Sequence, residues 1–164
     1  SLLGLADKVS YEGEAALLLE DLARGYCKQF GFAWAKEECY DIISPQNPAI
    51  INTKNLFRQI IADLQTDQEK AYIAAKFHGA LVHAIGQMAD HLHLQKIAFS
   101  GGVFQNTLLL DMIQHHLAPD YQLFFHRQLS PNDENISFGQ WAYATANASF
   151  HSSPIHSSSL IPHP

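Results

Sequence analysis

The strongest chemical signal in the sequence is a nine-residue run, Ala98–Asn106 (AFSGGVFQN). Gly101 and Gly102 follow a short apolar stretch and precede a helical pattern. Glycine lets a backbone approach a ligand closely and adopt a positive φ angle, and the free N–H groups at a helix start favour an anionic or strongly polar ligand. The run lacks the ending of a P-loop and the third glycine of a dinucleotide-binding turn. The residues alone therefore leave two interpretations open, a structural strand-to-helix turn and a phosphate cradle. Asn106 is then either a cap or surface residue, or an amide that contacts a base or sugar.

Carboxylates at the expected starts of two helices form the second signal. Asp133 and Glu134 precede the last helical pattern, and Glu14 follows Gly13 at the start of the first. Acidic residues at such positions usually cap the helix. A carboxylate oxygen also suits Mg²⁺, Mn²⁺ or iron, so Asp133 is a candidate metal ligand. One carboxylate does not hold a metal alone, and the remaining ligands must come from elsewhere.

Histidine and cysteine spacing gives no independent support for a metal or nucleophile. The chain has ten histidines, and neither the His91/His93 pair nor the His115/His116 pair has the i, i+4 spacing that places two rings on one side of a helix. Core or surface roles are expected for them. Cys27 and Cys39 form no CxxC pattern. We expect two free thiols in a reducing cytoplasm, with no histidine close enough to activate either one.

Composition limits the class of protein. The chain has 164 residues, of which 47% are hydrophobic and 16% charged, as in a globular domain. Its net charge of −6 argues against nucleic-acid binding driven by phosphate contacts. The apolar runs are too short to span a bilayer, and no secretory signal pattern is present. A cytoplasmic protein is expected, without a membrane partner.

Hydrophobic periodicity predicts five helices and three strands. The expected helices begin near Gly13, at Asn52 or Thr53, after a Thr66 cap (Asp67–His91), at Gln105 (to Leu117) and at Ile136 (to Ala148). The expected strands are Glu38–Ile43, Lys96–Ser100 (as a buried strand) and Tyr121–Phe125. The order of the last four elements is strand, helix, strand, helix, which predicts a helix-rich α/β fold with the last two strands parallel. Residues 1–148 form the expected domain, and the Ser/His/Pro-rich residues 149–164 a flexible tail.

Taken together and in order, several segments resemble one family. They are Val9–Ala16, Ala74–His78, Ala98–Asn106, Ser130–Asp133 and Ile136–Gln140. The resemblance is to the last part of the HypF-type carbamoyltransferase of [NiFe]-hydrogenase maturation. It implies the second lobe of a two-lobed actin-like ATPase fold (ASKHA, RNase H-like).

The family resemblance also implies an activity and a site. Such enzymes make carbamoyl-adenylate from carbamoyl phosphate and ATP, and transfer carbamoyl to the C-terminal cysteine of a HypE-type partner. ATP or carbamoyl-adenylate is the implied ligand, together with a divalent metal that is expected only with the first lobe. The implied nucleotide-binding residues are Gly13, Glu14, Ser100, Gly101, Gly102 and Asn106. Asp133 is the implied metal ligand, and no catalytic residue is identified.

The sequence departs from the family pattern in ways that keep alternatives open. Glu134 and Asn135 stand where the family usually has two glycines, and the apolar start, Ser1–Leu5, indicates a fragment without the upstream domains. Such a fragment is expected to be inactive alone. One alternative is the related enzyme that places threonylcarbamoyl on tRNA. Another is a noncatalytic module that pairs with a second copy or another protein through an exposed apolar face.

Overall fold

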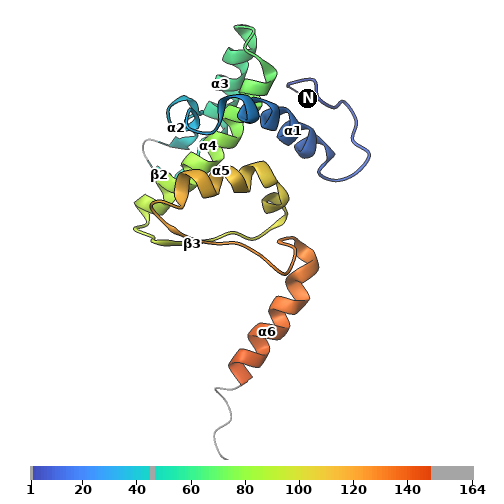
Figure 1. The fold of residues 1–164 in the computed structure, drawn as a ribbon, viewed down its shortest axis with the longest axis vertical. Coiled ribbons are helices and arrows are strands. Elements are labelled where there is room, and N and C mark those ends of the chain that lie inside the picture. Colours follow the sequence, from blue (N-terminus) through green and yellow to red (C-terminus); the bar gives the residue numbers. More distant parts are fainter. Residues whose placement is uncertain (1, 45–46, 149–164) are drawn as a thin grey trace, which may run out of the picture.

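The computed structural model describes residues 2–44 and 47–148, which form a helix-rich α/β structure (Figure 1). The elements in chain order are α1 (Glu14–Phe30), α2 (Ala35–Glu38), β1 (Ile43–Ser44), β2 (Asn47–Ile51), α3 (Thr53–Gln65), α4 (Lys70–His91), β3 (Lys96–Ala98), the 3₁₀ helix η1 (Gly102–Gln105), α5 (Thr107–Leu117), β4 (Gln122–Phe124), the 3₁₀ helix η2 (Asp133–Asn135) and α6 (Ile136–Ala148). The expected fold class is confirmed. The predicted tail, residues 149–164, lies outside the described residues.

Helix α4 is the centre of the core, and α1, α2, α3 and α5 pack against it. Two glycines of α4 allow this close packing. A Cβ atom on Gly79 would lie 3.1 Å from the Cβ of Ala35 in α2, and one on Gly86 would lie 3.2 Å from the Cδ2 of Leu117 in α5. Glycine costs about 1 kcal/mol relative to alanine inside a helix, and here it lets the neighbouring elements approach.

The two strands that flank α5 are parallel, as predicted. Ile97 of β3 pairs with Leu123 of β4, and the N–H of Phe99 extends the pairing to the carbonyl of Phe124 at 2.9 Å. The expectation that the Lys96–Ser100 strand, now β3, is buried is wrong in part. Ile97 and Leu123 pack against the core while Ala98 and Phe124 are exposed, because successive residues of a strand point to opposite faces.

Two other local predictions differ from the structure. The strand expected at Glu38–Ile43 is replaced by the end of α2 and a β1–β2 hairpin that begins only at Ile43. Thr66 does not cap α4. Its hydroxyl donates to the carbonyls of Ala62 (3.2 Å) and Asp63 (3.1 Å), so it ends α3. A threonine hydroxyl serves either role, so only the backbone path decides between them.

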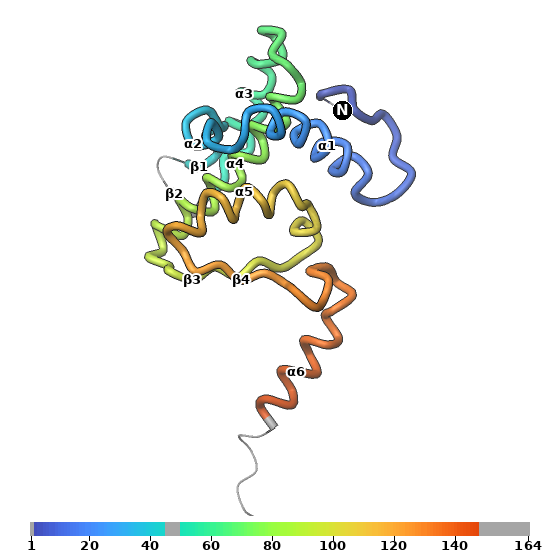
Figure 2. The backbone as a smooth tube through the Cα atoms, viewed as in Figure 1, coloured from blue at the N-terminus to red at the C-terminus, as the bar shows by residue number. Residues whose placement is uncertain are grey.

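Helix α6 has the predicted bounds but extends away from the rest of the molecule (Figure 2). Phe138 and Trp141 lie on one side of it, and Ile136 and Tyr143 on the other. All four are exposed, Trp141 by 63% and Tyr143 by 75%. In the described part of the chain, no helix combines the length and apolarity needed to cross a membrane.

Candidate functional site

The Ser100–Gly102 turn joins β3 to η1 and presents backbone to an open surface. Gly101 has φ 106° and ψ 158°, a conformation that side chains rarely allow. Its N–H donates to the carbonyl of Pro131 at 2.7 Å. The N–H groups of Gly102 and Val103 have no acceptor among the described residues, and the space beside both Gly101 and Gly102 is empty. Gly101 therefore shapes the turn, and the next two amides remain available to a ligand.

Asn106 caps α5 and contacts a buried histidine. Its Oδ1 accepts the N–H of Leu109 at 2.8 Å, and its Nδ2 lies 3.0 Å from Nε2 of His78. Nδ1 of His78 lies 2.8 Å from the carbonyl of Ala74. A carbonyl only accepts, so Nδ1 carries the proton and Nε2 accepts from Asn106. Burial lowers the pKa of His78, which is 2% exposed, and this favours the same neutral form.

A second buried polar cluster lies beside the start of α5. Oε1 of Glu20 accepts hydrogen bonds from Nη2 of Arg24 (2.6 Å), Oγ1 of Thr107 (2.9 Å) and the N–H of Leu108 (3.0 Å). Burial raises the pKa of Glu20, but these three hydrogen bonds outweigh it and the net shift is downward. Sequence reasoning missed this cluster. The one signal for it in the sequence was the i, i+4 spacing of Glu20 and Arg24.

The Gly13–Glu14 turn starts α1. Gly13 has φ 89°, and the Glu14 carboxylate accepts the N–H of Ser10. Two turns further along α1, Glu20 and Arg24 contact Thr107 of α5. Helix α1, which starts at the Gly13–Glu14 turn, is therefore bonded through buried Glu20 and half-buried Arg24 to α5, which follows the glycine turn and η1.

The loop before α6 lies next to the glycine turn. The Ser130 hydroxyl accepts from Nε2 of Gln105 at 3.3 Å, and its carbonyl accepts from Nδ2 of Asn135 at 2.5 Å. Asn135 thus closes the loop. Asp133 is exposed at the start of η2. Among the described residues no group of three or more His, Cys, Asp or Glu side chains could hold a metal. Asp133 and its described neighbours therefore do not by themselves fit a metal ion.

The expectation that no histidine lies close to either thiol is wrong for Cys39. Its Sγ lies 3.1 Å from Nδ1 of His83, 44 residues away in the sequence. Both cysteines are free, as predicted. Burial raises the pKa of Cys39 and raises that of Cys27 to about 11, so both are thiols near neutral pH.

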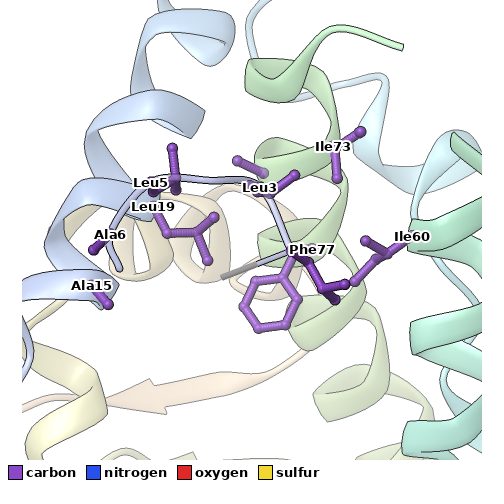
Figure 3. Close-up of a pocket in the computed structure, with 10 residues that line it drawn as sticks. Leu3, Leu5, Ala6, Ala15, Leu19, Ile60, Ile73 and Phe77 are labelled. Atoms are coloured by element: carbon purple, nitrogen blue, oxygen red, sulfur yellow. The ribbon is translucent and has the colours of Figure 1, made fainter. Parts of the chain in front are cut away.

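Two cavities in the described structure contain none of the predicted site residues. One, of about 250 Å³, lies among apolar side chains that include Leu3, Leu19 and Phe77 (Figure 3). The other, of about 530 Å³, lies between α2, α4 and the end of α5 and is lined in part by His83 and His116. Gly102 and Asp133 are exposed, and Asn106 is half-buried against His78.

The arrangement of strand, glycine turn and helix is typical of one class of binding protein. A parallel strand leads through a glycine turn to the short helix η1, whose first two amides have no acceptor among the described residues, as in α/β proteins that bind phosphate or nucleotide at a helix start. The family model described as "Carbamoyltransferase, Kae1-like Domain, second subdomain" matches residues 1–140. The chain belongs to this family.

Curated relatives and solved structures agree with this assignment. The chain is 31% identical over 144 residues to "Carbamoyltransferase HypF" of Synechocystis sp., and 28% identical over 159 residues to "Carbamoyltransferase HypF2" of Cupriavidus necator, covering 85% of this chain in both cases. It spans 17% and 20% of those proteins.

Two HypF structures are similar to this chain. A full-length HypF in its phosphate- and nucleotide-bound form has TM-score 0.68 at 29% identity, over 92% of this chain and 19% of that one. The HypF of T. kodakarensis has TM-score 0.66 at 22% identity, over 90% and 18%, and supports the fold alone.

Proposed function

We propose that this chain is the nucleotide-binding second lobe of a carbamoyltransferase. The carbamoyl group would pass from carbamoyl-adenylate to the C-terminal cysteine of a HypE-type acceptor in [NiFe]-hydrogenase maturation. The observation that carries the proposal is the glycine turn, where the N–H groups of Gly102 and Val103 have no acceptor among the described residues. The named HypF relatives and the nucleotide-bound HypF structure support the same assignment.

In this proposal the chain binds and orients the nucleotide. The two free amides would donate to a phosphate oxygen, and the N-terminal end of the helical segment would favour its negative charge. Asp133 would contribute one oxygen ligand to a divalent metal completed by residues outside this chain, and the metal would offset phosphate charge. Gly13 and Glu14 would line the nucleoside. A first lobe would close the site in such an enzyme, so residues 1–164 by themselves are expected to lack transferase activity.

Thermal unfolding with and without Mg-ATP tests the proposal. A ligand at 100 times its Kd stabilises the fold by about 2.7 kcal/mol. Gly102→Ala is the informative variant, because the new Cβ fills the space that a ligand must enter while the fold has room for it. Gly25→Ala is the matched control, since Gly25 is also exposed with nothing nearby.

We expect Mg-ATP to raise the Tm of the parent and of Gly25→Ala but not of Gly102→Ala. If the parent shows no shift, residues 1–148 should replace the matching segment of the Synechocystis relative, and carbamoyl transfer should be measured. A chimaera that folds and transfers carbamoyl equally well with and without Gly102→Ala would reject the proposed role of the turn.

A further inference from the structure

His78 is buried in the core, yet it is connected to the exposed glycine turn by consecutive hydrogen bonds. The first two are those from Nδ1 of His78 to the Ala74 carbonyl (2.8 Å) and from Nδ2 of Asn106 to Nε2 of His78 (3.0 Å). Both ring nitrogens are thereby used. His78 is 2% exposed, so a lost partner would not be replaced by bulk water.

The orientation of the Asn106 amide is also fixed. Its Oδ1 accepts the Leu109 N–H at 2.8 Å and its Nδ2 donates to His78. Exchanging the two ends of the amide would place Nδ2 against the Leu109 N–H and Oδ1 against the unprotonated Nε2, so both hydrogen bonds would be lost. Only one combination of His78 tautomer and Asn106 amide orientation therefore keeps both hydrogen bonds.

The backbone continues this chain of contacts to the turn. The N–H of Asn106 donates to the carbonyl of Val103 at 3.2 Å, and the N–H of Phe104 donates to the carbonyl of Gly101 at 3.0 Å. The place of Asn106 therefore sets the path of η1. That path decides where the free N–H groups of Gly102 and Val103 point.

We propose that His78 is a positioning residue for nucleotide binding: through Asn106 it holds η1 in the orientation that aims the Gly102 and Val103 amides at a phosphate group of the nucleotide. This inference rests on the proposed function for its ligand. It assigns Asn106 a supporting role, in which the side chain acts on the protein rather than on a base or sugar.

Two single variants and their combination separate this role from helix capping. Asn106→Ser keeps a good cap for α5 but is too short to reach His78. His78→Phe keeps an aromatic ring in the buried space and removes the acceptor for Asn106. Met112→Ala is the control, because Met112 is fully buried in α5 and its truncation lowers stability without touching the turn.

Two measurements are made on the chain: ¹⁵N relaxation of the Gly102 and Val103 amides, and the Kd for Mg-ATP. We expect both single variants to increase the mobility of these amides and to weaken binding roughly five- to tenfold. The double variant should lose no more affinity than either single variant, because each of the three proteins lacks the same Asn106–His78 hydrogen bond. Met112→Ala should lower Tm but leave the Kd and the amide mobility unchanged.

Several results would overturn the inference. They are unchanged amide mobility in Asn106→Ser and His78→Phe, additive losses in the double variant, or an equal loss of affinity in Met112→Ala. If the parent binds no Mg-ATP, the chimaera decides the proposed function, and the relaxation data on this chain still decide whether His78 positions the turn. The ¹⁵N shifts of His78 give a direct check, since they should show a protonated Nδ1 and an accepting Nε2.

Discussion

The start of α5 and the loop before α6 both supply residues to the candidate site, but they are held very differently. At the start of α5, the buried side chains of His78 and Glu20 bond to Asn106, Thr107 and the Leu108 amide. In the loop before α6, Asp133 is exposed, and the helix that follows exposes Trp141 and Tyr143. The polar contacts of the first region are made within this chain, and the second region presents exposed side chains.

This difference separates two kinds of site residue. A phosphate-binding turn gains from being held rigid before the ligand arrives, because less ordering is lost on binding. A metal ligand at the edge of a lobe needs only to be in place when the opposite ligands close on it. We therefore expect substitutions in the first region to affect folding strongly, and those in the second to act on assembly instead.

The largest expected effect is at Glu20. Glu20→Ala leaves Arg24, Thr107 and the Leu108 amide without their shared acceptor, and should lower the free energy of unfolding by about 2 kcal/mol. Asp133→Asn is the matched change in the second region and should alter it by less than about 0.5 kcal/mol. Chemical denaturation measures both. Equal losses would show that the two regions do not differ as described.

The next effect contrasts the two glycines of the turn. Gly101→Ala forces a side chain into φ 106° and should cost about 1–2 kcal/mol. Gly102→Ala has free space and no positive φ angle, and should cost less than about 0.5 kcal/mol. Thermal unfolding of the two variants without nucleotide tests this. A larger loss in Gly102→Ala would mean that the turn is shaped differently.

A smaller effect concerns pH. Burial lowers the pKa of His78 below its usual 6.5, so the unfolded chain takes up the proton first as pH falls. The stability that neutral His78 contributes is fully present above about pH 6.5 and is lost progressively as pH falls below it. His116, whose pKa burial also lowers, contributes in the same direction. In His78→Phe the decline should be shallower, and an unchanged slope would remove His78 as its source.

The smallest effect on folding is expected on α6. Trp141 is 63% exposed, so Trp141→Ser should change the free energy of unfolding by less than about 0.5 kcal/mol. If the exposed aromatic faces pair two copies of the chain, the same variant should weaken a dimer seen by sedimentation velocity. A large loss of stability at low protein concentration would show that α6 packs on the body after all.

The sequence determined much of this protein because several signals are local. Helical spacing predicted the bounds of α6. Asn52 was one of two candidate caps, a cap was one of the roles left open for Asn106, and the structure shows both as caps. Two strands around a helix implied parallel pairing, which β3 and β4 have. The ordered motifs pointed to the family that matches residues 1–140. These features depend on neighbours within a few positions, where residue type limits the backbone directly.

Only the tertiary structure decided which polar side chains meet. Cys39 and His83 are 44 residues apart in the sequence and 3.1 Å apart in the fold. Asn106 finds its acceptor on His78, and Glu20 finds its donors on Thr107 and Leu108. No spacing rule predicts such pairs, because they arise when helices pack around α4 and buried polar groups must find partners wherever the packing brings them. The sequence alone identified the Ser100–Gly102 turn as a candidate site. Helix packing determined which side chains hold the segment that follows it, through the Asn106–His78 contact.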